Sequence, residues 1–120
     1  MKTTKKNFII WITFFLVIAF ITSGSAQPQK EEVIKIRTSA VCGMCKDRIE
    51  KGLKSEKGIN DVSLDIETKI VTVKFQGTKT NPDKIRERIS KLGYDADNLL
   101  ADKTAYGKLP ACCKKDEKKH

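Results

Sequence analysis

The sequence predicts an α+β domain in which one antiparallel sheet carries two helices on one of its faces. Three segments alternate apolar with polar residues, and two others repeat apolar residues at helical spacing. Together they follow the order strand, helix, strand, strand, helix. The chain has 120 residues, so we expect one domain with a modest core rather than a two-domain enzyme with a sheltered cleft.

The first strand is expected at residues 33–39, where Ile34 and Ile36 share one face and charged side chains occupy the other. A glycine-containing loop follows. Beyond the loop, apolar residues recur every fourth position between charged ones, which predicts a helix with one buried stripe, and Gly58 closes the segment. That stripe consists of Cys45, Ile49 and Leu53.

A β-hairpin is expected next, because two alternating segments flank a short polar connection at residues 67–69. Alternation places every second side chain on the same face of the sheet. The inward-facing residues are Val62, Leu64 and Ile66 in one strand and Val71, Val73 and Phe75 in the other.

A second helix begins after Asn81, which is a favourable N-cap residue, with Pro82 at the first helical position and Asp83 in the first turn. Gly93 is placed to end it, and a short final strand is expected at residues 94–96. This order is that of a ferredoxin-like βαββαβ sandwich. The buried stripe of the second helix consists of Ile85, Ile89 and Leu92.

Residues 1–26 have the layout of a secretory signal peptide. Lysines come first, an apolar run at residues 8–21 follows, and small residues continue to Ala26. A spanning helix needs about 20 apolar residues, so this run is too short for a stable membrane anchor. We expect cleavage near Ala26 and a mature protein in the periplasm or outside the cell, beginning with a flexible lead-in at residues 27–32.

Cys42 and Cys45 form a C-x-x-C pair at the junction of the first strand and the first helix. Two thiols at this spacing converge on one point, and the positive end of the helix favours their thiolate forms. Thiolates select Cu(I), zinc and similar thiophilic ions. The pair is therefore the candidate metal site.

With these cysteines at this place, residues 33–97 resemble the heavy-metal-associated domain family. That family includes copper chaperones, the N-terminal modules of copper-transporting ATPases and the periplasmic mercury-binding protein. The resemblance extends to Gly93 and Tyr94, where the family commonly has glycine followed by an aromatic residue. The roles that it implies are metal binding for Cys42 and Cys45 and packing beneath the site for Ile49 and Leu53.

The loop departs from the family pattern. The family usually has Gly-Met-x before the first cysteine, whereas this chain has Ser39-Ala40-Val41 there and places Gly43 and Met44 between the two cysteines. Met44 either turns inward as a substitute packing residue or lies exposed beside the site. A thioether ligand role is less favoured, because methionine is more often a packing residue.

Residues 98–120 form a cysteine-containing charged tail outside the usual domain. Its adjacent Cys112 and Cys113 can form only a strained vicinal disulfide, so free thiols or a metal site are at least as well supported. One hypothesis is that the tail folds back and supplies one or two further thiolates to the ion. A fully enclosed four-sulfur site would favour zinc over Cu(I).

Two other interpretations of the C-x-x-C pair stay open: a disulfide-stabilised binding module and a periplasmic thiol–disulfide redox protein. Nucleic-acid binding is not expected despite the net charge of +9, because basic and acidic residues are interleaved and no aromatic platform accompanies them. Enzyme activity is not expected, because the sole histidine is His120 at the chain end and general acid–base catalysis lacks its usual carriers.

The sequence thus indicates an exported, monomeric protein that holds a soft ion between Cys42 and Cys45 and carries or scavenges it by thiolate exchange. Cu(I) is favoured, and Hg(II) and Zn(II) stay open. The resemblance implies a metal-transporting ATPase or another metal-transfer protein as partner. Lys46 and Arg48 are expected to offset the charge of the metal-bound thiolates, and Tyr94 is interpreted as a packing residue.

Overall fold

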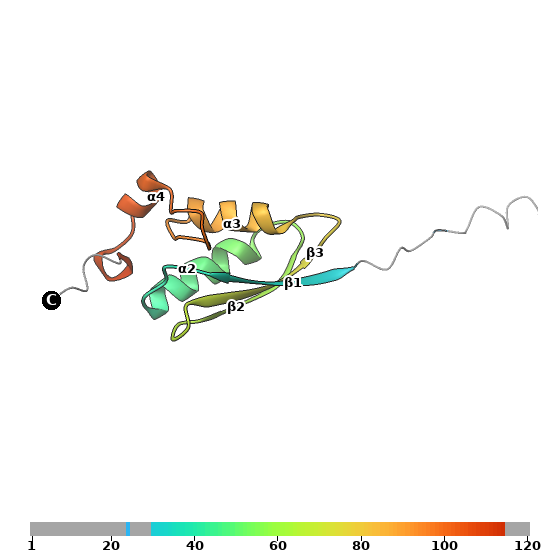
Figure 1. Cartoon of the computed structure of the whole chain (residues 1–120), viewed down its shortest axis with the longest axis horizontal. Helices are drawn as coiled ribbons and strands as arrows, with labels where there is room; N and C mark the ends of the chain where they lie inside the picture. Colours follow the sequence, from blue (N-terminus) through green and yellow to red (C-terminus); the bar gives the residue numbers. More distant parts are fainter. Residues whose placement is uncertain (1–23, 25–29, 115–120) are drawn as a thin grey trace, which may run out of the picture.

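The computed structural model describes residue 24 and residues 30–114, so the predicted signal peptide, apart from Gly24, and the last six residues lie outside the described part of the chain. Figure 1 shows the elements in the predicted order. They are β1 (Glu31–Arg37), α2 (Gly43–Lys54), β2 (Ile59–Asp65), β3 (Ile70–Gln76), α3 (Pro82–Lys91), α4 (Lys103–Gly107) and the 3₁₀ turn η1 (Ala111–Cys113).

The sheet has the strand order β1-β3-β2, with both pairs antiparallel. Val73 lies at its centre, opposite Ile34 of β1 and Val62 of β2. The β2–β3 turn is closed by Asp65, whose Oδ1 accepts a hydrogen bond from the Glu67 N–H at 2.9 Å. β1 begins at Glu31, two residues before the apolar alternation starts, because backbone pairing with β3 continues beyond the buried side chains.

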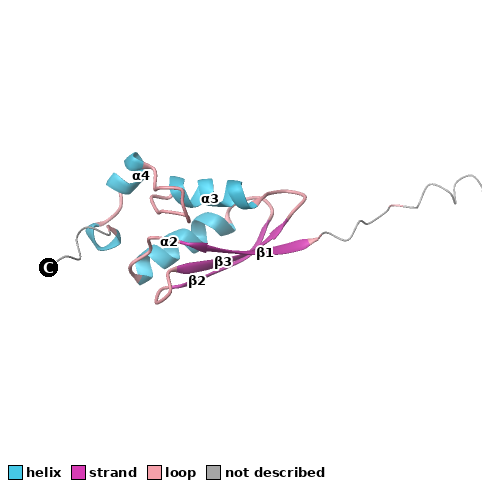
Figure 2. Cartoon of the chain, in the orientation of Figure 1, coloured by secondary structure: helices cyan, strands magenta, loops and turns pink. Residues whose placement is uncertain are grey.

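Both long helices cover the same face of the sheet, as Figure 2 shows. Their predicted stripes are buried, with the exception of Leu92, which is half-buried at the end of α3. Leu92 instead lies over Gly52 of α2, where an added Cβ would come within 2.5 Å of a Leu92 methyl group. The fold class predicted from the sequence is confirmed. The fully buried stripe residues are Cys45, Ile49, Leu53, Ile85 and Ile89.

The start of α3 also follows the prediction. The side chain of Asn81 caps the helix, accepting a hydrogen bond from the Lys84 N–H at 2.9 Å. Pro82 and Asp83 occupy the first turn, where a missing N–H and a negative charge are both favourable.

The predicted final strand at residues 94–96 is reduced to a single bridge between Ala96 and Thr38, at the end of β1. The chain turns away immediately afterwards, because Asp97 adopts a positive φ of 52°. The Asp97 carboxylate holds this turn in place: it accepts a hydrogen bond from the Arg37 N–H and one from Arg86 Nε, each at 2.9 Å. Ala96 therefore marks the place of the last strand without forming one.

Residues 98–114, which we call the C-terminal strap, pack onto the domain. They include α4 and η1, and they add Leu109 and Cys113 to the hydrophobic core. Figure 1 shows η1 beside the start of α2. Within residues 30–114, no helix is long and apolar enough to cross a membrane.

Candidate metal centre

The site lies at the loop that connects β1 to α2. Thr38 fixes the start of the connecting loop: its hydroxyl donates to the Lys69 carbonyl at 3.0 Å and accepts from the Ala40 N–H at 3.3 Å. Cys42 then occupies the N-cap position in an extended conformation, with φ −154° and ψ 169°. α2 thus begins at Gly43, two residues before the start of its apolar stripe.

Cys42 and Cys45 meet at this helix start. Their Sγ atoms lie 3.1 Å apart. Cys42 is half-buried and lies outside the helix, whereas Cys45 is fully buried in the first turn of α2. The pair therefore has an outer sulfur that a partner can reach and an inner sulfur fixed by the core.

The surroundings of Cys42 favour its thiolate. Partial burial acts to raise the pKa of the Cys42 thiol, but hydrogen bonds from Cys45, Cys113 and the Met44 backbone outweigh burial and lower the pKa to about 7. A large fraction of Cys42 is therefore deprotonated at neutral pH, and the thiolate is the form that binds metals and attacks them.

The strap brings the other two cysteines to the same place. Cys113 is 1% exposed, and its Sγ lies 3.8 Å from the Sγ of Cys42. Cys112 is exposed, with its Sγ 4.0 Å from that of Cys113. The Sγ atoms of Cys42, Cys112 and Cys113 lie within 4.8 Å of one another. The fold-back expected from the sequence is thus present, and all four cysteines are free thiols.

Met44 lies exposed beside the site rather than turned inward. Its side chain is 49% exposed, and its Sδ lies 3.9 Å from the Sγ of Cys112. Of the two placements left open by the sequence, the structure therefore shows the outer one. Met44 and Cys112 thus form an exposed pair of sulfur-containing side chains next to the buried Cys113.

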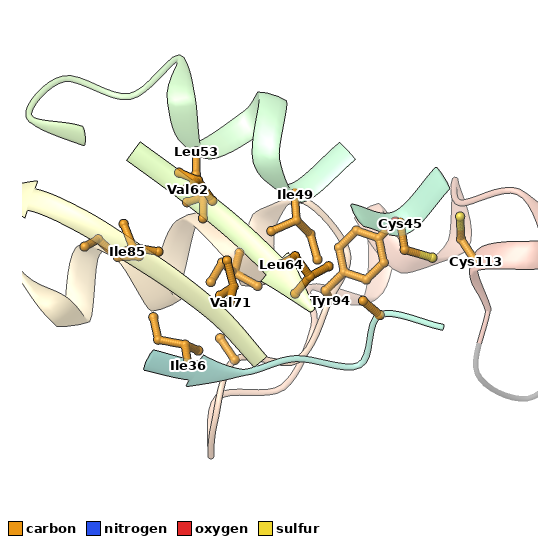
Figure 3. Close-up of a cluster of buried hydrophobic side chains, with 14 of the residues drawn as sticks. Ile36, Cys45, Ile49, Leu53, Val62, Leu64, Val71, Ile85, Tyr94 and Cys113 are labelled. Atoms are coloured by element: carbon orange, nitrogen blue, oxygen red, sulfur yellow. The ribbon is translucent and has the colours of Figure 1, made fainter. Parts of the chain in front are cut away.

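Tyr94 is a site residue that sequence analysis assigned only to packing. In Figure 3, the Tyr94 ring and Cys113 lie on either side of Cys45. Within the described residues, the buried Tyr94 hydroxyl has no partner at good hydrogen-bond geometry. Burial, together with the nearby sulfurs of Cys113 and Cys45, raises the pKa of Tyr94. The hydroxyl keeps its proton and is placed to donate to a thiolate. The position of Tyr94 directly after Gly93, where the family commonly has an aromatic residue, was the signal that could have identified it.

Cys113 has the opposite electrostatic environment to Cys42. Burial, with a further contribution from Cys45, raises the pKa of Cys113 to about 12, while the Tyr94 hydroxyl acts against this shift. Cys113 therefore carries a proton in the metal-free protein, and a bound cation would take the place of that proton.

Of the two positive side chains expected near the site, Lys46 pairs with an acidic side chain of the same helix. Lys46 Nζ lies 3.8 Å from Glu50 Oε1, and Glu50 also accepts a hydrogen bond from the Leu64 N–H at 2.9 Å. Arg48 is exposed. The expected role of Lys46 and Arg48 in balancing thiolate charge stays a prediction.

Comparison with known proteins assigns the family. Residues 37–95 match the profile of the heavy-metal-associated domain. A solution structure of a CopA variant with copper, from Bacillus subtilis, is 30% identical, and the match covers 62% of this chain and 96% of that one, with a TM-score of 0.51. This chain belongs to the heavy-metal-associated domain family.

Two other similar proteins are larger or more distant. The copper-exporting P-type ATPase of Bacillus subtilis is 33% identical over 85 residues, which are 71% of this chain but 10% of the ATPase. The chain thus spans about a tenth of the length of that curated relative. Oxidized MerP from Ralstonia metallidurans is 20% identical with a TM-score of 0.55, covering 57% of this chain and 96% of MerP, and shares the fold.

The family match ends before the strap. It includes Cys42, Cys45 and Tyr94, whereas Cys112 and Cys113 lie beyond residue 95. The site therefore combines the C-x-x-C pair of the heavy-metal-associated domain with two sulfurs from a segment outside the matched range.

Metal–sulfur bond lengths allow a test of how an ion fits. With bonds of about 2.3 Å, sulfurs around one ion lie about 3.8 Å apart in a tetrahedral site and about 4.0 Å apart in a trigonal one. The Cys42–Cys113 Sγ separation of 3.8 Å agrees with these values. The 3.1 Å separation of Cys42 and Cys45 must widen. This all-sulfur donor set suits a thiophilic ion.

Proposed function

We propose that this protein is an exported, monomeric metal-binding protein that holds a soft ion at Cys42 and Cys45 and carries or scavenges it. The observation that carries the proposal is the 3.1 Å separation of the two Sγ atoms at the start of α2 in a heavy-metal-associated domain. Cu(I) is the favoured ion because relatives of this chain are copper-exporting ATPases, and Hg(II) and Zn(II) are the alternatives.

Ion transfer would proceed by ligand exchange rather than by catalysis. An incoming thiolate attacks the bound ion before one of the resident thiolates leaves. Cys42 is the better leaving position, because it is half-buried at the N-cap, whereas Cys45 is held in the core by α2. A metal-transporting ATPase or another metal-transfer protein is the corresponding partner.

Export is the part of the proposal that rests on the predicted signal peptide. The proposal places the mature protein in the periplasm or outside the cell, after cleavage near Ala26. Its support is the basic, apolar and small-residue order of residues 1–26. Fractionation of cells that produce the full chain, with mass measurement of the mature N-terminus, tests this part of the proposal separately from metal binding.

The central test is an anaerobic titration of the reduced mature chain, residues 27–120, with Cu(I) against a competing chelator. We expect one ion per chain and loss of tight binding in the Cys42→Ser/Cys45→Ser double variant. Cys112→Ser is the matched control, because it removes an exposed thiol near the site. Circular dichroism verifies the fold of each variant. Tight binding that survives in the double variant would contradict the proposal.

A redox function is the second candidate, because the same close pair of thiols includes one whose pKa is lowered to about 7. A redox protein would cycle a Cys42–Cys45 disulfide against a partner at a defined potential. Equilibration with glutathione buffers, followed by thiol counting, distinguishes the two functions. A carrier binds its ion only with both thiols reduced.

A further inference from the structure

We propose that Cys113 is a third thiolate ligand of the bound ion, so that Cys42, Cys45 and Cys113 hold it together. In this arrangement Cys112 stays outside the coordination sphere as an exposed sulfur at the mouth of the site. The inference rests on the proposed function and adds a retention step to it. It assigns a specific role to the strap, which lies beyond the family match.

The strap is fixed to the domain where it leaves α3. Ser90, which is buried, donates its hydroxyl to the Leu100 carbonyl at 2.7 Å, and its own carbonyl accepts from the Asp102 N–H at 3.0 Å. The Asp95 carboxylate accepts from the Ala101 N–H at 2.9 Å. These three contacts set the direction in which the strap returns toward the site.

The middle of the strap packs tightly on the domain. Asp102 caps α4 by accepting from the Ala105 N–H at 2.8 Å. Gly93 has a φ of +101°, and a Cβ at this position would come within 3.1 Å of both the Ala105 backbone and the Leu109 side chain. The close contact requires a residue without a side chain at position 93. The strap is therefore a docked segment of the fold.

The 3₁₀ turn at the end of the strap gives its two cysteines different exposure, although their Sγ atoms lie 4.0 Å apart. Pro110 begins the turn, and its carbonyl accepts from the Cys113 N–H at 2.9 Å. Consecutive side chains in such a turn point in directions about 120° apart. Accordingly, Cys113 is buried against the domain and Cys112 is exposed.

Two observations at the inner end point to a ligand. The Cys113 and Cys42 Sγ atoms lie 3.8 Å apart, close to the separation of about 4.0 Å that three sulfurs take around one ion. In addition, the fully buried Tyr94 hydroxyl has no partner at good geometry within the described residues and lies beside Cys45 and Cys113. A thiolate on either cysteine would supply the missing acceptor.

The adjustment needed between Cys42 and Cys45 is small and falls on the N-cap side chain. The Cys42–Cys45 separation must widen by about 0.9 Å to reach the spacing of a three-sulfur site. Cys42 is the N-cap residue and makes no side-chain capping hydrogen bond to α2. Outward movement of its side chain lengthens its sulfur contact with Cys45, which a shared ion would replace.

A third resident thiolate changes how the ion leaves. In a two-thiolate carrier, the partner's thiolate takes the third position during exchange. Here Cys113 already occupies that position, so a partner must displace it or wait for the strap to move. The proposal therefore predicts tighter binding and slower transfer, which is the behaviour of a scavenger.

The test compares Cys113→Ser with Cys112→Ser in the reduced protein, by Cu(I) competition with a chelator and by the rate of transfer to that chelator. We expect Cys113→Ser to weaken binding at least about tenfold, since even loss of a ligand's supporting partner commonly costs 10–100-fold. It should also speed transfer. Cys112→Ser should leave the affinity within about threefold of wild type, a difference well below one tenfold step of 1.4 kcal/mol.

X-ray absorption of the Cu(I)-loaded wild-type protein provides a measurement that needs no variant. Three sulfur neighbours are expected, and two would overturn the inference even if Cys113→Ser fails to fold. Equal losses in both serine variants would also overturn it, because Cys112 would then be a ligand too. An affinity unchanged by Cys113→Ser refutes the third ligand while leaving the proposed function intact. Absence of binding to the wild type refutes the proposed function itself.

Discussion

The domain at residues 31–96 and the strap at residues 98–114 differ in how they bury their side chains. The domain is built on long-range strand pairing and two amphipathic helices whose stripes are almost entirely buried. In the strap, α4 buries no residue, and the core gains only Leu109 and Cys113. The comparison indicates that the domain provides most of the buried core, whereas the strap is a docked addition with few core residues that can change the chemistry of the site.

The largest effect should follow a change in the domain core. Ile49→Ala removes a fully buried side chain beneath the site and should lower the free energy of unfolding by about 3 kcal/mol. Urea denaturation of the reduced protein measures this loss. Leu100→Ala, at a position that is 72% exposed, is the control and should change stability by less than about 0.5 kcal/mol. Comparable losses in the two variants would refute the packing argument.

A smaller and local effect should follow a change in the strap. Leu109→Ala removes the larger of its two core contacts and should cost about 2 kcal/mol. Because the strap adds only Leu109 and Cys113 to the buried core, we expect it to open before the domain unfolds. Hydrogen exchange should then speed up at residues 103–113 but not in β3. Equal acceleration in β3 would show that strap and domain unfold as one unit.

The two sides of the site should also differ in their pH dependence. With its pKa lowered to about 7, Cys42 should remain reactive toward iodoacetamide below pH 8, and its rate should fall as pH drops through 7. An ordinary thiol with a pKa of 9.0 would lose its reactivity about two pH units higher. Mass spectrometry of peptides after timed alkylation measures each cysteine separately. A midpoint near 9 for Cys42 would contradict the assigned hydrogen bonds.

The smallest effect on stability is expected at Tyr94. Tyr94→Phe removes a hydroxyl that lacks a well-placed partner, so the free energy of unfolding should change by less than about 1 kcal/mol. The chemical effect should be clearer: the hydroxyl acts to lower the pKa of Cys113, so its removal should raise that pKa further and slow alkylation of Cys113. Unchanged Cys113 reactivity would indicate that Tyr94 serves packing alone.

The sequence was sufficient for the domain because its elements carry strong periodic patterns. The stripes of α2 and α3, the hairpin and the Asn81 cap all follow from local residue choices. The last strand could not be predicted in its true extent, because a tertiary contact between the Asp97 carboxylate and both Arg37 and Arg86 turns the chain there. No local pattern encodes that contact.

The candidate site divides in the same way. The C-x-x-C spacing was enough to predict that the thiols of Cys42 and Cys45 lie close together, and the structure places their Sγ atoms 3.1 Å apart. The strap has no periodicity, and α4 is only five residues long, so its docking could be stated from the sequence only as one hypothesis. The role of the Tyr94 hydroxyl beside the thiols was also not predicted, because a tyrosine at this position is equally consistent with packing. It becomes visible only when the hydroxyl is seen beside the thiols.

The 3₁₀ turn that carries Cys112 and Cys113 makes the two cysteines unequal. Two adjacent cysteines look like a duplicate in which either could replace the other. With about 120° between consecutive side chains, however, the turn directs only one of them inward. Inserting one residue between Pro110 and Cys112 would move Cys112 to the inward position, whereas deleting Ala111 would place Lys114 there. Cys112 and Cys113 are therefore not interchangeable. A shift of the pair by one residue would change which side chain is buried.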